Sequence, residues 1–461
     1  MFSGVIIDTK LIARYGGNGP RYTSYPTADR FVEAFDASAY RHWLRLRPFS
    51  GHARPFSLYV HLPFCGTLCY YCACNKIVTR DRTRASAYLG YLEKEIALVC
   101  AELGAERHVE QIHLGGGTPT FFSDEELRQL KSLISSNFKL NPAGEYAIEI
   151  DPRTVDVERI AMLAELGFNR ISLGVQDFDP VVQRAVNRVQ TVEETLAVTQ
   201  AARAHGFRSI NFDLIYGLPR QTIAGFERTL DQVCDAAPDR IALYSYAHLP
   251  TVFMPQRRIA AAELPTPEVK LRLFTLAIEK FTAAGYVYIG MDHFAKPEDD
   301  LAVAQRQGRL TRNFQGYSSA GDTDIVGLGV SAIGSIGPAY SQNHKTLEQY
   351  YACLDAGVLP VMRGLQASAD DLVRRAVIQS LACHGRVAKE SISIAHLIDF
   401  DRYFERELKD LQALRDDGLV ELDAEWVNVT PAGRLLVRAV CMVFDRYLRE
   451  GQARAQYSRV L

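Results

Sequence analysis

The strongest constraint on the fold is an alternation of strand and helix patterns that repeats six times between residues 57 and 284. The strand patterns cover residues 57–62, 111–114, 146–151, 170–175, 209–215 and 241–245, and a helical pattern follows each of them. Strand–helix units in series predict a parallel sheet with right-handed crossovers. The fold class is therefore α/β, with the sheet either curved into a TIM-type barrel or flat and doubly wound.

Polar residues at the ends of the strand patterns favour the barrel. Glu149 and Asp151 end the third strand pattern, Gln176 follows the fourth, and Asp213 lies in the fifth. In a (β/α) barrel, the carboxyl ends of the strands form the face that carries catalytic groups. Polar residues also begin loops, but that explanation does not account for their recurrence strand after strand. We therefore predict a partial TIM-type (β/α)6 barrel with its site at this face.

Charge and apolar patterning exclude several classes of protein. The 461 residues include 52 Lys and Arg against 54 Asp and Glu, a net charge of −2, whereas proteins that mainly bind nucleic acid are usually basic. The sequence has no apolar run as long as the roughly 18 residues of a membrane span. Residues 1–15 lack the apolar core of a signal peptide. We expect a cytoplasmic protein without nucleic-acid partners and, because no heptad pattern stands out, a monomer.

Four of the nine cysteines, Cys65, Cys69, Cys72 and Cys74, lie within ten residues. Disulfides are rare in large cytosolic chains, so this group indicates metal or cluster ligation. Structural zinc sites usually take two ligand pairs separated by a longer spacer. The C-x3-C-x2-C spacing suits three thiolates that hold three irons of one [4Fe–4S] cluster and leave the fourth iron open. Cys74 lies outside this pattern, and zinc or a plain electron-transfer cluster is the alternative.

The third strand pattern places a carboxylate inside the expected barrel. Alternation along the strand puts Glu149 on the opposite face from Ile148 and Ile150, which would pack under helices. A carboxylate in that position needs a cation or hydrogen-bond donors, which a ligand or a neighbouring Arg would supply. The glycine run 115–117 allows a ligand to approach the backbone closely, although a tight strand-to-helix turn needs glycine as well.

Several longer stretches identify a family. The cysteine motif, with Tyr71 before its last cysteine, resembles the signature of radical S-adenosylmethionine (SAM) enzymes. Over nearly its full length the sequence resembles the bacterial oxygen-independent coproporphyrinogen III oxidases (also called dehydrogenases). The stretches that carry this resemblance are Tyr22–Thr27, Tyr59–Cys65, Cys72–Lys76, Gly115–Thr120, Gly174–Phe178, Asp213–Pro219 and Asn313–Tyr317.

The resemblance implies a reaction of anaerobic haem synthesis. Two propionate side chains of coproporphyrinogen III become vinyl groups, which gives protoporphyrinogen IX. A low-potential donor of the flavodoxin or ferredoxin type reduces one [4Fe–4S] cluster, and cluster-bound SAM then yields a 5′-deoxyadenosyl radical. A second SAM molecule lies beside the first. A haem chaperone of the same superfamily, which binds haem and decarboxylates nothing, is the nearest alternative.

The resemblance also implies roles for particular residues. Cys65, Cys69 and Cys72 ligate the cluster. Tyr59, Gly116, Glu149 and Ile333 match positions around the first SAM, and Glu149 is also the catalytic candidate. Tyr71, Gly117, Thr118, Gln176, Arg188, Asp213 and Ala247 match positions around the second SAM. The substrate carries four carboxylates, so we expect basic or donor groups from polar, aperiodic segments to bind it: Arg21, His293, Arg312 and Gln315.

The pattern along the chain predicts four regions. Residues 1–54 form an N-terminal extension that contacts substrate, and residues 55–290 form the radical SAM barrel. Residues 291–365 form an irregular pocket wall that completes the catalytic domain. Residues 366–461 form a mainly helical, winged-helix-like domain with helices at 370–383, 402–417 and 431–448 and a hairpin at 418–430. Its charges nearly cancel, which favours substrate covering over DNA binding.

Overall fold

The chain forms two compact units, each built from separate stretches of sequence. The computed structural model describes residues 9–47, 55–105, 107–449, 457 and 460. Residues 30–266 and 322–366 make the first unit, the barrel unit. Residues up to 29, 267–321 and 367–461 make the second, the helical unit. Both ends of the expected N-terminal extension, 1–8 and 48–54, lie outside the described residues, and its contact with substrate stays a prediction.

Six parallel strands form the centre of the barrel unit. They are β1 (Phe56–Leu62), β4 (His108–Gly116), β5 (Lys139–Ile150), β6 (Arg170–Gln176), β7 (Ser209–Tyr216) and β8 (Arg240–Ser245). Neighbouring strands pair in this order, and every pair is parallel. A doubly wound sheet reverses its strand order at a switch point, and this series does not. The predicted partial barrel is confirmed, and the flat alternative is wrong.

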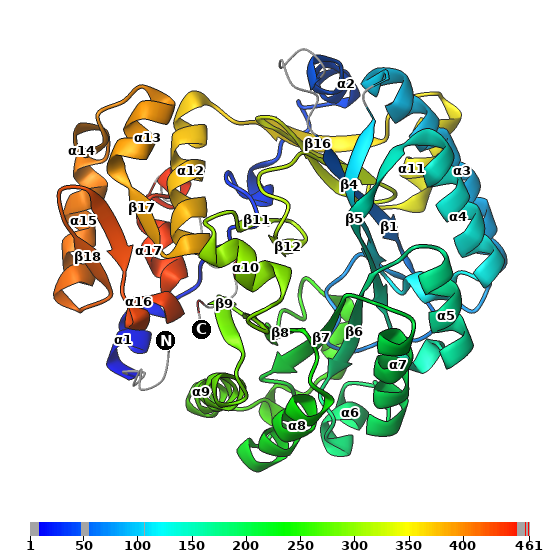
Figure 1. The fold of residues 1–461 in the computed structure, drawn as a ribbon, viewed down its shortest axis with the longest axis horizontal. Helices are drawn as coiled ribbons and strands as arrows, with labels where there is room; N and C mark the ends of the chain where they lie inside the picture. The colour runs from blue at the N-terminus through cyan, green and yellow to red at the C-terminus, as the bar shows by residue number, and fades with distance from the viewer. Residues whose placement is uncertain (1–8, 48–54, 106, 450–456, 458–459, 461) are drawn as a thin grey trace. The chain divides into compact units, whose positions relative to one another are not determined.

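Helices cover the outer face of these strands (Figure 1). They are α3 (Thr83–Leu103), α4 (Asp124–Asn137), α5 (Val157–Glu165), α6 (Pro180–Ala185), α7 (Val192–Ala204) and α8 (Ile223–Ala236). A capping box of Ser123 and Glu126 starts α4, and Pro180 is the first residue of α6. Helix α5 starts at Val157 because the Asp156 side chain caps it.

Further strands extend the sheet beyond β1. They are β13 (Ile325–Leu328), which is parallel to β1, and the antiparallel β14 (Ile333–Ile336), β15 (Ala339–Asn343) and β16 (Val361–Gln366). Helices α2 (Ala37–Leu46) and α11 (Leu347–Asp355) belong to the same unit. The short parallel pair β2 (Phe64–Cys65) and β3 (Ile77–Val78) flanks the cysteine loop. The expectation that 291–365 is irregular is wrong here, since these strands lie within that range. Strands this short leave little periodicity in a sequence, so the pattern did not predict them.

The helical unit contains many short elements. From its first two stretches come α1 (Thr9–Tyr15), α9 (Pro267–Ala283), β9 (Val287–Gly290), β10 (His293–Ala295), α10 (Asp300–Arg306), β11 (Thr311–Asn313) and β12 (Gly316–Ser318). The last stretch begins with α12 (Ala369–His384), β17 (Arg386–Ala388) and α13 (Lys389–His396). It continues with α14 (Phe400–Tyr403), α15 (Glu405–Asp416), β18 (Val420–Leu422) and β19 (Trp426–Val429). No helix among the described residues has both the length and the apolarity needed to cross a bilayer.

The prediction of one continuous helix over residues 431–448 is wrong. The structure has three short helices there: α16 (Pro431–Leu435), α17 (Val437–Val443) and α18 (Arg446–Arg449). The Asp445 side chain accepts hydrogen bonds from the backbone N–H groups of Tyr447 and Leu448, so it caps a new helix and ends the old one. The expected helices at 370–383 and 402–417 and the hairpin at 418–430 are present, but the second helix breaks at Phe404.

Tyrosines anchor the N-terminal segment inside the helical unit. The Tyr22 hydroxyl donates to Asp445 (3.0 Å), and the Tyr25 hydroxyl accepts from the backbone N–H of Arg446 (3.1 Å). The Arg438 guanidinium donates to the carbonyl oxygen of Pro20 (2.9 Å). Residues from the two ends of the chain therefore share one core.

Glu95 is the centre of a buried network behind β1. Its carboxylate accepts hydrogen bonds from the Gly329 N–H, the Asn343 amide and the Tyr350 hydroxyl, each at 2.6 Å. None of the Lys and Arg residues in the described ranges pairs with it. Burial raises the pKa of Glu95 to about 7 because the carboxylate is removed from water.

Replacing Glu95 by Gln should change how stability depends on pH. A raised folded-state pKa means that ionised Glu95 costs stability as the pH rises from about 4.5 to about 7. The melting temperature of the wild type should therefore fall over this range, and the Glu95→Gln variant should lack that part of the fall. Thermal unfolding between pH 5 and pH 8 measures it, with Glu93→Gln, an exposed position of the same helix, as the control. Parallel curves for all three proteins would contradict the assignment.

Candidate active site

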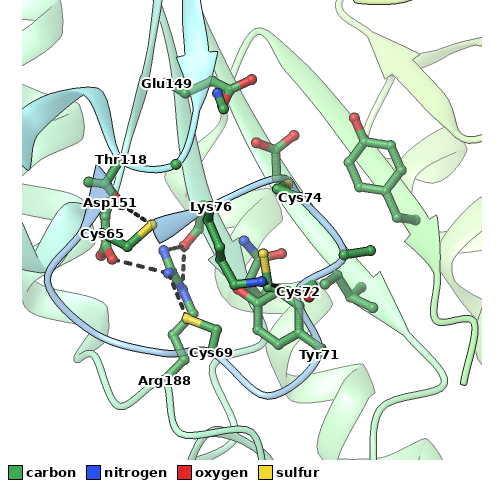
Figure 2. A pocket seen from close by; sticks show the side chains of 18 of the residues that line it. Cys65, Cys69, Tyr71, Cys72, Cys74, Lys76, Thr118, Glu149, Asp151 and Arg188 are labelled. Atoms are coloured by element: carbon green, nitrogen blue, oxygen red, sulfur yellow. Dashed lines mark hydrogen bonds and ion pairs between the residues drawn. The ribbon is translucent and has the colours of Figure 1, made fainter. Parts of the chain in front are cut away.

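A cavity of about 440 Å³ opens at the carboxyl ends of the parallel strands (Figure 2). Apart from Tyr59 and Ile333, every residue expected to hold the cluster or SAM lines it. These residues are Cys65, Cys69, Tyr71, Cys72, Gly116, Gly117, Thr118, Glu149, Gln176, Arg188, Asp213 and Ala247. They come from the loop after β1, from the ends of the other five parallel strands or the loops that directly follow them, and, for Arg188, from the segment after α6. The volume lies within the range of small-molecule sites.

Tyr59 and Ile333 are not among the residues that line the cavity. Tyr59 of β1 is in register with Gly327 of β13, and the carbonyl oxygen of Ile333 approaches the same glycine so closely that a Cβ there would lie 2.7 Å away. The Tyr59 ring stacks on His113, with 5.9 Å between ring centroids. His113 in turn reaches Glu149, so Tyr59 connects to the cavity through one side chain.

Polar groups surround the thiols of the cysteine motif. Burial raises the pKa of Cys65 to about 11, although the Thr118 hydroxyl donates to its sulfur (3.4 Å). A hydrogen bond from the Cys74 thiol lowers the pKa of Cys72 to about 6, and the nearby Lys76 ammonium acts in the same direction. Iron binds the thiolate form, so these donors favour ligation.

The donor set fits an iron–sulfur cluster. Three thiols on one loop face a single cavity, beside the positive charges of Lys76, Arg153 and Arg188. Within the described ranges, no three His, Cys, Asp or Glu side chains converge as the ligands of one metal ion would. Thiolates that bind different irons of a cluster have no need to converge on one point.

An aspartate and two arginines lie beside Cys69. The Asp151 carboxylate pairs with Arg153 (2.6 Å) and with Arg188 (3.1 Å). Nη1 of Arg188 lies 3.6 Å from the Cys69 sulfur, and Nη2 of Arg153 lies 3.9 Å from it. Burial alone would raise the pKa of Asp151, but the Arg188 charge and the hydrogen bonds from Arg153 hold it below its ordinary value. Arg188 is therefore a buried, paired residue, held further by the carbonyl oxygen of Gly174 (2.6 Å).

Glu149 faces the cavity, and its partners are His113 and a backbone amide. Nε2 of His113 lies 3.0 Å from one carboxylate oxygen, and the Gly116 N–H donates to the other (3.2 Å). The sequence allowed a neighbouring Arg as the partner; the structure has a histidine in its place. Burial raises the pKa of Glu149, but these two donors outweigh it and the net shift is downward. Glu149 is therefore an ionised carboxylate available to a cation or a hydroxyl group.

The glycine run is needed by the packing of the protein itself. A Cβ on Gly115 would lie 2.8 Å from Glu149, and one on Gly117 would lie 2.6 Å from the backbone of Pro63. Gly116 has a φ of +111°, and a Cβ there would lie 2.5 Å from the His61 ring. Packing inside the protein therefore requires glycine at all three positions, and two of them, Gly116 and Gly117, also line the cavity.

Asp213 is a second carboxylate in the wall. Burial raises its pKa to about 6, while hydrogen bonds from Ser172 (2.7 Å) and Asn211 (2.9 Å) act against the rise. Asp213 therefore changes its charge closer to neutral pH than an ordinary aspartate does.

The four candidate substrate-binding residues gather in the helical unit. Arg21 and His293 both pair with the buried carboxylate of Asp292, the histidine at 2.7 Å. Nε of Arg312 donates to the carbonyl oxygen of Arg21 (3.1 Å). Nη1 of Arg312 and Nε2 of Gln315 are buried without a hydrogen-bond partner among the described residues. Such donors are what a carboxylate ligand would satisfy.

Sequence reasoning missed three residues that organise these groups: His113, Arg153 and Asp292. His113 faces the barrel interior from the middle of β4, where one polar residue gives little signal. Arg153 follows Asp151 by two residues, and this short spacing was the one feature of the sequence from which their ion pair could have been predicted. Asp292 comes directly before His293, but nothing in the local pattern indicates that a distant arginine, Arg21, pairs with it.

Known proteins resemble this chain over almost its whole length. Residues 59–233 match the model of the radical SAM superfamily. The oxygen-independent coproporphyrinogen III oxidase of Pseudomonas aeruginosa is 53% identical over 456 residues, with 98% of each chain covered. The enzyme of the same name from Synechocystis is 41% identical and covers 100% of this chain and 99% of its own.

The chain belongs to the oxygen-independent coproporphyrinogen III oxidase family. The solved structure of the Escherichia coli coproporphyrinogen III oxidase, described as a radical SAM enzyme, matches with a TM-score of 0.91 at 47% identity. The match covers 96% of this chain and 99% of that one. The family resemblance expected from the motifs is confirmed, and so is the α/β fold with a mainly helical C-terminal part.

Replacing Asp151 by Asn should destabilise this member of the oxidase family strongly. The change leaves the guanidinium groups of Arg153 and Arg188 without their carboxylate in a buried site, which typically costs about 3–5 kcal/mol. Urea unfolding under anaerobic conditions measures the free energy of unfolding. Asp235→Asn, at an exposed position of α8, should change it by less than about 0.5 kcal/mol. Equal effects of the two substitutions would show that the buried ion pairs contribute little.

Proposed function

We propose that this chain converts coproporphyrinogen III to protoporphyrinogen IX without oxygen, by oxidative decarboxylation of two propionate side chains to vinyl groups. One observation carries the proposal. The cavity at the strand ends combines the three-cysteine motif with Glu149 and Arg188, in a chain that aligns over nearly its full length with oxidases of that name. The product class places the reaction in haem synthesis.

The proposed site holds one [4Fe–4S] cluster on Cys65, Cys69 and Cys72 and two SAM molecules in the same cavity. When bound, these groups would supply a 5′-deoxyadenosyl radical that removes a hydrogen atom from the β-carbon of a propionate. A low-potential donor of the flavodoxin or ferredoxin type would provide the electron. The protein itself would bind and orient SAM and the substrate and would exclude water from the site.

The charged residues of the wall suit the polar groups of SAM. Glu149, kept ionised by its two donors, offers a carboxylate to the ammonium group or ribose hydroxyls of the first SAM. Glu149 is therefore the residue we assign to orienting that SAM, which makes it the catalytic candidate. Arg188 and Asp213 offer opposite charges to the second SAM. Thr118 and Gln176 add hydrogen-bonding groups to the same wall.

The helical unit supplies the proposed substrate contacts. Arg21, His293, Arg312 and Gln315 present an excess of positive charge and donors over the single carboxylate of Asp292. The substrate is a tetracarboxylate, and the two propionates that do not react need charge-assisted hydrogen bonds to hold them. We assign the unpartnered donors of Arg312 and Gln315 to one of these carboxylates.

Anaerobic turnover tests the function directly. Reconstituted protein with SAM, a reductant and coproporphyrinogen III should release methionine and two CO₂ per protoporphyrinogen IX formed. Cys69→Ala should remove the brown chromophore and the activity, because the cluster loses a ligand. Cys353→Ala, at a half-buried position of α11, should keep both.

Three outcomes would contradict the proposed function or its ligand assignment. Full activity in Cys69→Ala would refute the ligand assignment. Haem binding without any CO₂ release by the wild type would favour the haem chaperone, and zinc without iron on metal analysis would favour a zinc protein.

Substrate affinity should depend on Arg312. A charge-assisted hydrogen bond contributes about 1.5–3 kcal/mol, so Arg312→Gln should raise KM for coproporphyrinogen III about 10- to 100-fold with little change in kcat. Steady-state kinetics under anaerobic conditions measure both constants. Arg309→Gln, at an exposed position three residues away, is the matched control. Equal KM values in the two variants would remove Arg312 from the substrate site.

A further inference from the structure

The surroundings of Cys69 differ from those of Cys65, the first cysteine of the motif. Its sulfur lies 3.6 Å from a guanidinium nitrogen of Arg188 and 3.9 Å from one of Arg153. Figure 2 shows the Arg188 guanidinium between Cys69 and Asp151. The Cys65 sulfur, in contrast, accepts a hydrogen bond from the neutral hydroxyl of Thr118. Two positive charges and one negative charge, that of Asp151, therefore lie beside Cys69 and leave a local excess of +1.

Arg153 is held in this position by the protein alone. Its Nε and Nη2 pair with the two oxygens of the Asp151 carboxylate at 2.9 and 2.6 Å, a bidentate arrangement. Nη2 also donates to the Thr67 hydroxyl (3.2 Å). The short turn Pro152–Thr154, capped by Asp151, fixes the backbone that carries Arg153. Arg188, in contrast, is assigned to the second SAM in the proposed function.

We propose that Arg153 is a positioning residue that raises the reduction potential of the cluster held by Cys69, through its positive charge and its N–H···S contact. The proposal rests on the proposed function. When the cluster takes up one electron its negative charge grows by one, and no bond or proton changes. A fixed cation and a hydrogen bond to a ligand sulfur stabilise that added charge, because both act at short range in a site with little water.

The test is a redox titration of anaerobically reconstituted protein without SAM, with dithionite as the electron source. The electron paramagnetic resonance signal of the reduced cluster reports the potential. Arg153→Gln should lower the equilibrium constant for reduction about tenfold, which is about 59 mV for a one-electron couple. Arg153→Lys keeps the charge but loses the planar fork, so its shift should have the same sign and be smaller. Arg228→Gln, an exposed arginine on α8, is the control and should leave the potential unchanged.

The possible results separate this inference from the function on which it rests. A wild-type potential in Arg153→Gln would overturn the inference and leave the proposed function intact. If Arg153→Gln loses its cluster, Arg153→Lys decides, and a wild-type potential there overturns the inference as well. Wild-type protein that binds no iron or sulfide would overturn both. A cluster that survives Cys69→Ala would overturn the part assigned to the sulfur contact.

Discussion

The parallel pairing of six strands in sequence order is the constraint on which the site depends. It brings the carboxyl ends of all six strands to one edge, so that residues far apart in the chain, such as Cys65 and Asp213, line one cavity. A slip of one residue between β4 and β5 would turn Glu149 away from His113 and toward the helices. The buried isoleucines on the other face of β5, Ile148 and Ile150, prevent that slip because they must remain in the core.

Several charged groups near the cavity are tolerated because they have partners inside the protein. Asp151 compensates Arg153 and Arg188, and His113 with a backbone amide compensates Glu149. Ion pairs that are buried in this way are poor sources of stability, since desolvation offsets much of their attraction. These ion pairs instead orient the side chains, because they hold them at fixed positions around a space that polar ligands can enter.

The sequence predicted most of what regular periodicity encodes. Strand order and the position of Glu149 follow from local pattern and from the geometry of parallel strands. The division of the last helix at Asp445 was missed because a side-chain cap competes with an uninterrupted apolar pattern. The partners of Glu149 and Arg21 were missed because pairing between distant strands and segments leaves no trace in local spacing. The resemblance to family motifs predicted more of the residues that line the cavity than periodicity did, since a motif carries information on a whole site and periodicity only on local structure.

The order of the chain in the helical unit has a consequence for synthesis. The segment that contains Tyr22 is made before its partner Asp445, which lies 423 residues later in the chain. At about 5–20 residues per second, the early segment waits on the order of tens of seconds before its core can form. During that interval Tyr22 lacks the hydrogen-bond acceptor that it has in the folded protein. A nascent chain of this kind therefore carries one core incomplete until the residues around Asp445 have been made.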